Sequence, residues 1–134
     1  MTARDGGCAC GAVRFRAEGD PRFAFVCHCG ACRRKTGTGH AASAAYPRDA
    51  VTITGTARVY PRPAPAGHAV DQAFCGTCGS PLWNTTPRAE TLIMLDLGAF
   101  DDPSGLTPGR VFHAEDALPW DRQPWHDHPQ GDAT

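Results

Sequence analysis

The stretch VCHCGACRRKTG, residues 26–37, carries the densest reactive chemistry of this chain. It places three thiols, one imidazole and three cationic side chains close together. Crowded thiolates repel one another and oxidise readily unless a cation holds them. Zn²⁺ binds thiolates strongly and has no redox chemistry of its own, so the stretch predicts a zinc centre. Three protein ligands leave one tetrahedral position open, which is typical of zinc sites that do chemistry.

The fourth ligand beside Cys27, Cys29 and Cys32 decides between an open and a closed site. His28 or His40 would complete a closed Cys₃His set, which is common in structural zinc sites. His28 stands between two ligands and is expected to point away from their ion, so His40 is the better candidate. An iron–sulfur cluster would need a fourth cysteine from another part of the chain. We favour the open site.

Four further cysteines form two pairs, one near each end of the chain. The pairs are Cys8-Ala9-Cys10-Gly11 and Cys75-Gly76-Thr77-Cys78-Gly79. Glycine permits the tight turns that let both thiols of a pair face one ion. Together the pairs supply a closed Cys₄ site, which has no vacancy and is therefore structural. The alternative is two redox dithiols, but a thioredoxin-type C-x-x-C needs a βαβ context that this sequence lacks.

Length and charge place limits on the function. With 134 residues and a formal net charge of −1, we expect one domain and no nucleic-acid or membrane surface. Residues 1–7 contain no apolar segment of a signal peptide, and no apolar run reaches membrane-spanning length. We therefore expect a cytoplasmic protein. Structural disulfides are rare in the cytoplasm, and seven cysteines is an odd number, so metal ligation is the better explanation for them.

The rest of the chain alternates short apolar segments with turns rich in the 15 glycines and 12 prolines, which predicts a mainly β fold with little helix. The segment 91–97 is the most apolar and is the expected central strand. One short helix is expected over 29–36, ending at Gly37. The expected strands cover residues 12–17, 23–26, 41–46, 51–54, 56–60, 69–74, 82–86, 91–97 and 110–113.

Two segments are predicted to lie outside the strands. Residues 61–67 contain three prolines, which cannot donate to a β-ladder, so a surface loop is expected there. Residues 124–134 are polar and aperiodic, which predicts a flexible C-terminal tail after a zinc domain over residues 1–123.

The three cysteine groups and their neighbours, in this order, resemble the glutathione-dependent formaldehyde-activating enzyme (GFA) family, which includes centromere protein V. The resemblance covers roughly residues 5 to 122. It rests on Gly7-Cys8-Ala9-Cys10-Gly11, Cys27-His28-Cys29, Cys32-Arg33-Arg34, Thr36-Gly37, Phe74-Cys75-Gly76-Thr77-Cys78-Gly79, Pro81-Leu82, Leu97-Gly98, Asp101-Asp102-Pro103, His113 and Leu118-Pro119-Trp120.

The resemblance implies a fold of small packed antiparallel sheets, the β-tent, around a structural zinc. It implies two zinc ions per chain. We expect that the second site can be partly occupied. The structural ion would be held by Cys8, Cys10, Cys75 and Cys78, and the catalytic ion by Cys27, Cys29 and Cys32. The implied activity is that of a carbon–sulfur lyase that forms or splits S-(hydroxymethyl)glutathione, with glutathione or another small thiol–aldehyde adduct as its partner.

Residues around the second cluster are candidates for supporting roles. Arg33, Arg34 and Lys35 would offset the negative charge of a zinc trithiolate and attract an anionic thiol, or form a solvated basic face. A histidine with a pKa near neutrality could shuttle the proton of the adduct. Our predicted catalytic residues are Cys27, Cys29, Cys32, His28 and Arg33, and further candidates for the proton shuttle or the pocket wall are His40, His113, Trp83 and Trp120.

Two other function classes remain open. A non-catalytic zinc-binding interaction module would have two structural zinc ions and no vacancy. A thiol redox sensor would form a disulfide between Cys32 and either Cys27 or Cys29, and would hold one zinc per chain.

Overall fold

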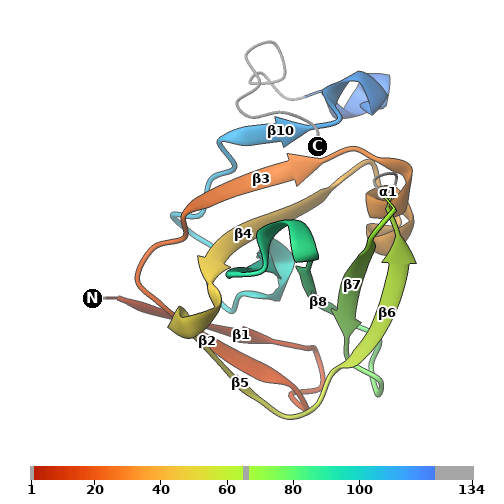
Figure 1. Ribbon diagram of the computed structural model, residues 1–134. Coiled ribbons are helices and arrows are strands. Elements are labelled where there is room, and N and C mark those ends of the chain that lie inside the picture. Colours follow the sequence, from red (N-terminus) through yellow and green to blue (C-terminus); the bar gives the residue numbers. More distant parts are fainter. Residues whose placement is uncertain (1, 65–66, 123–134) are drawn as a thin grey trace.

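The computed structural model describes residues 2–64 and 67–122. Within these ranges the chain forms ten strands and one α-helix, which confirms the predicted mainly β fold (Figure 1). The strands are β1 (Ala3–Gly7), β2 (Arg14–Glu18), β3 (Phe23–Cys27), β4 (Ala41–Pro47), β5 (Val51–Thr54), β6 (Arg58–Pro63), β7 (Ala69–Phe74), β8 (Pro81–Thr85), β9 (Leu92–Asp96) and β10 (Arg110–Phe112). The helices are α1 (Gly30–Thr36) and the short 3₁₀ helices η1 (Arg48–Ala50), η2 (Pro87–Ala89), η3 (Leu97–Ala99), η4 (Ala114–Asp116) and η5 (Pro119–Asp121).

The strands form two sheets. The small sheet has the order β1-β2-β5, and the large sheet has the order β10-β3-β4-β9-β8-β7-β6. The pairs are antiparallel except that β10 lies parallel to β3. The apolar segment 91–97 supplies β9, which is the middle strand of the large sheet, as predicted.

The main hydrophobic core lies between the small sheet and the β3–β4–β9 part of the large sheet. In β2, Phe15 and Ala17 are buried while Arg16 between them is exposed, as the alternating pattern predicts. Tyr46 of β4 is fully buried on the opposite side of this core. Only glycine fits at position 6, because a Cβ there would collide with the Ala99 carbonyl and the Phe15 ring.

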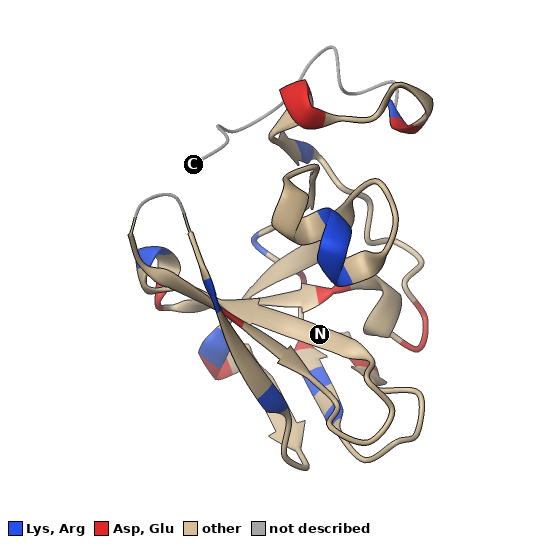
Figure 2. Cartoon of the chain, turned by 90° about the vertical axis from the view of Figure 1, so that its right-hand side faces the viewer, with Lys and Arg blue, Asp and Glu red and all other residues tan. Residues whose placement is uncertain are grey.

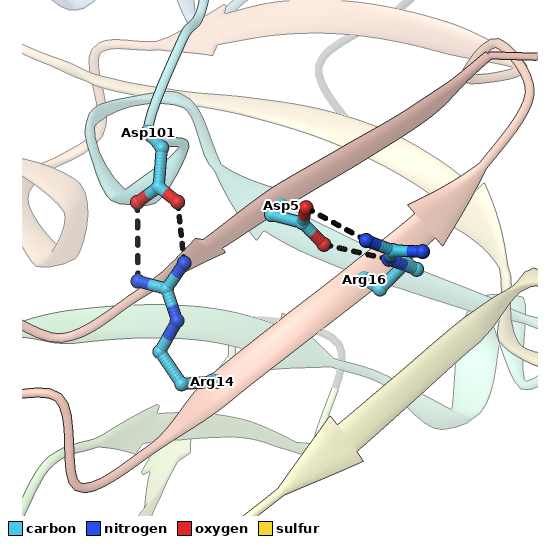
Figure 3. Close-up of polar contacts among 4 residues, drawn as sticks. All are labelled: Asp5, Arg14, Arg16 and Asp101. Carbon is cyan, nitrogen blue, oxygen red and sulfur yellow. Dashed lines mark hydrogen bonds and ion pairs between the residues drawn. The ribbon is translucent and has the colours of Figure 1, made fainter.

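Two bidentate ion pairs lie on the outside of the small sheet (Figure 3). Arg16 Nε and Nη2 donate to the Asp5 carboxylate at 2.8 and 3.1 Å across the β1–β2 pair. Both terminal nitrogens of Arg14 donate to the Asp101 carboxylate. Asp101 lies in the loop after η3, so this pair connects the small sheet to that loop. The arginine hydrogen bonds lower the pKa of both carboxyl groups, although the pairs are solvent-exposed and contribute modestly to stability.

The prediction of a loop over residues 61–67 is wrong for its first half. β6 continues through Pro61 and Pro63 and pairs with β7, with Arg62 opposite Val70. β6 is the edge strand of the large sheet, and an edge strand tolerates proline where the missing N–H would face away from the partner strand. Arg62 is therefore held in register by a β-ladder.

The predicted tail over 124–134 lies outside the described residues, so the division of the chain at residue 123 stays a prediction. Within the described ranges, no helix combines the length and the apolar character needed to cross a bilayer. The cytoplasmic location also stays a prediction.

Candidate metal centres

Four cysteines from two distant turns meet beside the small sheet. Cys8 and Cys10 lie in the turn after β1, and Cys75 and Cys78 lie in the turn between β7 and β8. Their sulfurs lie within 4.8 Å of one another, and Cys10 Sγ is 3.7 Å from both Cys8 Sγ and Cys75 Sγ. Sulfurs bound tetrahedrally to Zn²⁺ at about 2.3 Å lie about 3.8 Å apart, whereas a disulfide brings them to about 2 Å. This cluster, the quartet, therefore has the spacing of a closed zinc site.

Glycine and backbone amides shape the quartet. Gly11 and Gly79 adopt φ values of 81° and 79°, which side chains disfavour, and each donates its N–H to the carbonyl of the first cysteine in its turn. The Val13 N–H lies 3.3 Å from Cys8 Sγ, and the Thr77 N–H lies 3.4 Å from Cys75 Sγ. The Val13 N–H donor lowers the pKa of Cys8 and so favours the thiolate form that a metal requires.

Ser80 is a supporting residue that the sequence analysis did not identify. Its Oγ lies 3.2 Å from Cys78 Sγ and accepts the Ala9 N–H at 3.0 Å, so it joins the two cysteine turns. The hydrogen bond with Ser80 lowers the pKa of Cys78 to about 5. Ser80 therefore favours the thiolate form of Cys78, the form that binds a metal.

The second cluster, the trio, contains Cys27 at the end of β3, Cys29 at the N-cap of α1 and Cys32 inside α1. Their sulfurs also lie within 4.8 Å of one another. Cys27 and Cys32 are buried, whereas Cys29 is partly exposed and accepts the Cys32 N–H at 3.4 Å. Hydrogen bonds from the Cys27 and Cys32 thiols lower the pKa of Cys29, so Cys29 is the first of the three to ionise.

The described part of the chain brings no histidine or carboxylate into the trio. His28 and His40 instead form a separate group with Asp121: His40 Nδ1 lies 2.7 Å and His28 Nδ1 3.5 Å from Asp121 Oδ2. His28 is fully buried there. Position 39 must be glycine, because a Cβ at this position would collide with the Asp121 carboxylate. His113 lies with Glu115 and Asp116 in a further group. This arrangement favours the open site over a Cys₃His site.

Two phenylalanines that were not predicted to belong to the site pack against the trio. Phe25 precedes Cys27 on the same face of β3, and Phe112 of β10 lies opposite Cys27 in the parallel pair. Their ring centroids are 5.0 Å apart. Of the predicted wall residues, Trp83 packs against the hydrophobic core and Trp120 is 69% exposed. The apolar wall of the trio therefore depends on the placement of β10.

The three cations of α1 have different environments, although together they form one basic turn of the helix (Figure 2). The Lys35 ammonium is buried and donates to Asp96 at 2.7 Å and to Asn84 at 3.3 Å, so it fastens α1 to the large sheet. Lys35 is thus neither part of a solvated face nor available to a substrate. Arg33 is half-buried, and Arg34 is exposed with Nη1 3.4 Å from the Gly30 carbonyl.

The charge of Arg62, in β6, also affects the pKa values of two cysteines of the trio. The positive charge of Arg62 contributes to lowering the pKa of Cys29, after the hydrogen bonds within the trio, and it acts on Cys32 in the same direction. The prolines around Arg62 predict a surface loop, whereas the structure places Arg62 in β6, opposite Val70 of β7.

Comparison with known proteins agrees with the cysteine pattern. Residues 3–116 match the family model described as glutathione-dependent formaldehyde-activating enzyme. A Halomonas elongata protein, provisionally named as a glutathione-dependent formaldehyde-activating enzyme, is 30% identical over 112 residues, which cover 80% of this chain and 71% of that protein. A crystal structure of a Rhodobacter sphaeroides protein is similar with a TM-score of 0.59 and 21% identity, covering 78% of this chain and 91% of that chain, and supports the fold alone.

Proposed function

The chain belongs to the glutathione-dependent formaldehyde-activating enzyme family, and from this premise we propose that it is a zinc-dependent carbon–sulfur lyase. Its substrate would be the adduct of a thiol and a small aldehyde, such as S-(hydroxymethyl)glutathione. The observation that carries the proposal is the contrast between a complete quartet of thiols and a trio that lacks a fourth protein ligand among the described residues.

In this proposal the two clusters have different roles. Cys8, Cys10, Cys75 and Cys78 hold a structural zinc, and Cys27, Cys29 and Cys32 hold a second zinc with an open position. A zinc bound there supplies a ligand position that stabilises a substrate thiolate or polarises a carbonyl oxygen. Phe25 and Phe112 exclude water from one side of the trio, and the partly exposed Cys29 marks the side from which substrate enters.

The proposed reaction is an addition and its reverse. The thiol loses its proton to solvent, and its sulfur attacks the aldehyde carbon to form the C–S bond. The electron pair of the C=O π bond moves to oxygen, which takes a proton from solvent, so that the adduct contains all atoms of both reactants. In the opposite direction the C–S bond breaks and the thiol and aldehyde are released.

The buried His28 supports a positioning role within this site. The backbone N–H of His28 donates to the Phe112 carbonyl at 3.1 Å, and the imidazole Nδ1 lies 3.5 Å from Asp121 Oδ2, so the residue between Cys27 and Cys29 is held to β10 by its backbone and lies beside η5 through its side chain. Arg33 stays a predicted catalytic residue, because it lies half-buried on the helix that carries Cys32.

The test combines metal analysis with NMR measurement of exchange between thiol, aldehyde and adduct. We expect two zinc ions per chain, faster exchange of glutathione with formaldehyde in the presence of the wild type, and no acceleration with Cys29→Ser. Equal exchange with both proteins would refute the catalytic assignment. One zinc per chain together with reversible loss of thiols under mild oxidant would instead indicate a redox sensor, and two zinc ions without any exchange would indicate an interaction module.

A further inference from the structure

His28, His40 and Asp121 come together from three separate segments of the chain. His28 lies between β3 and α1, His40 directly precedes β4, and Asp121 is the last residue of η5. Two imidazole nitrogens and one carboxylate oxygen of this group lie within 4.8 Å of one another. The group contains no cysteine and is separate from both the quartet and the trio.

Both imidazoles direct the same ring nitrogen toward one carboxylate oxygen. His40 Nδ1 lies 2.7 Å and His28 Nδ1 lies 3.5 Å from Asp121 Oδ2. Nitrogen and oxygen ligands bound tetrahedrally to Zn²⁺ at about 2.0–2.1 Å lie about 3.4 Å apart. The two measured distances fall on either side of this value. A shift of the His40 ring by less than about 1 Å would therefore make room for the ion.

The burial of the Asp121 carboxylate requires a positive charge beside it, because removing an isolated charge from water is costly. Asp121 is only 4% exposed, and His28 is fully buried. The two imidazoles that pair with Asp121 are cationic only when they are protonated. A divalent metal ion can supply the charge instead. Two neutral imidazoles and one carboxylate suit Zn²⁺ and related transition metals better than Mg²⁺ or Ca²⁺.

The backbone holds two of the three side chains in place. The Asp121 N–H donates to the Leu118 carbonyl at 2.8 Å, and Thr36 Oγ1 donates to the His40 carbonyl at 2.8 Å. Glycine at position 39 leaves the space that the Asp121 carboxylate occupies beside His40. The donor atoms are thus arranged before any ion binds.

The group can be reached from one side. His40 is partly exposed and lines a cavity of about 670 Å³ that extends between the end of β1 and the C-terminal end of α1. Among the residues that the structure describes, the cysteines of the trio do not line this cavity. Three protein ligands leave at least one coordination position for water or a small ligand. An ion bound here would be reached separately from the trio.

We propose that His28, His40 and Asp121 form a third metal site, which binds Zn²⁺ or a related divalent transition metal. Without the ion, the hydrogen bond between His40 Nδ1 and Asp121 Oδ2 takes its place. The site lacks thiolates, so it binds Zn²⁺ more weakly than the two cysteine centres and fills after them. This inference does not depend on the proposed lyase activity.

The first test titrates Zn²⁺ alone into protein whose quartet and trio are already zinc-loaded, followed by calorimetry. The wild type is expected to bind one further equivalent. Loss of a group that only supports a metal ligand weakens binding by about 10- to 100-fold, so His40→Ala and Asp121→Asn, which remove ligands, should weaken the Kd of this equivalent by more than about 100-fold. His113→Ala removes a histidine from another group of possible ligands and is the matched control, with an unchanged Kd.

Absence of a saturable third equivalent in the wild type would overturn the inference and would show that the group holds only its hydrogen bond. Equal Kd values for the wild type and His40→Ala would also overturn it, because the ion would then be bound elsewhere.

The second test uses only the wild type and therefore does not depend on the folding of a variant. Co²⁺ bound by thiolates gives a strong near-ultraviolet charge-transfer band, which nitrogen and oxygen ligands do not give. Co²⁺ added as the third equivalent should produce visible d–d bands without increasing the near-ultraviolet band. In parallel, Zn²⁺ should shift the imidazole NMR signals of His28 and His40 and leave those of His113 unchanged. An increase in the thiolate band, or unchanged signals of His28 and His40, would overturn the inference.

Discussion

The quartet and the trio use the same ligand atom in opposite settings. The quartet lies in two turns at the end of the hairpins, where Cys10 and Cys78 are exposed and backbone N–H groups and Ser80 surround the sulfurs. The trio lies between a strand end and a helix, with two buried sulfurs and an aromatic wall.

The difference shows that ligand number alone does not separate the two sites. Four thiols would close the coordination shell of a zinc ion, and the quartet joins segments that are far apart in the sequence, such as Cys10 and Cys75. Three thiols leave a position open, and the neighbouring groups then determine which molecule can occupy it. The predictions below test this division between a site that holds the fold and a site that holds a substrate.

The largest effect is expected from Cys75→Ser in the quartet. Structural zinc contributes on the order of 10 kcal/mol to the folding of small domains, which is comparable to the whole stability of a typical domain. We expect loss of the near-UV circular dichroism spectrum and of cooperative thermal unfolding. Cys29→Ser in the trio is the control and should keep both. A folded Cys75→Ser protein with wild-type Tm would show that the quartet does not hold the fold.

The next effect is expected from Lys35→Met, which leaves the Asp96 carboxylate buried without its cation. Breaking a buried ion pair by removing one partner costs about 3–5 kcal/mol, measured here as the free energy of unfolding in denaturant. Because Lys35 fastens α1 to the sheet, zinc should be lost from the trio while one equivalent stays in the quartet. The double variant Lys35→Met, Asp96→Asn should recover much of the stability, and a failure to recover it would contradict the pairing.

A smaller effect is expected from Asp121→Asn. The charge-assisted hydrogen bond to His40 is weakened, and such bonds contribute about 1.5–3 kcal/mol. The change should lower Tm and slow the exchange reaction, since Asp121 also lies beside the buried His28 next to the trio. Asp116→Asn alters an exposed carboxylate and serves as the control. Equal Tm values for the two variants would show that the buried carboxylate has no structural role.

The smallest effect is expected from Arg14→Gln, which removes the exposed pair with Asp101 on the small sheet (Figure 3). The pair lowers the pKa of Asp101 below its ordinary value of 3.8, so its stabilisation is present above that pH and disappears as the pH falls through the lower pKa of the folded state. The Tm difference between wild type and variant should therefore be small at pH 7 and shrink on acidification. A difference that grows at low pH would contradict this assignment. Zinc content and exchange rate should not change.

Most strands and the division of the cysteines could be predicted because both depend on local patterns. Period-two alternation located β2, and the C-x-C and C-x-x-C turns with their glycines indicated how each pair would face one ion. The helix over 29–36 was also predictable, since Gly37 ends it with a φ of 75°.

The supporting residues of the trio could not be predicted in the same way. Lys35 and Asp96 are 61 positions apart and His40 and Asp121 are 81 positions apart, so the sequence offered no local signal that they would meet. The position of Arg62 in a strand could not be predicted, because the prolines on either side of it indicated a loop and not an edge strand.

The amino-acid sequence by itself determined which cysteines share a turn, most of the segments that become strands, and the family to which the chain belongs. The tertiary structure alone decided that β10 lies parallel to β3 and places Phe112 at the trio, that His28 and His40 turn to Asp121, and that Arg62 lies in an edge strand. The physical reason is that turn geometry and strand alternation are set by neighbouring residues, whereas the partners across a sheet are set by strand order and register.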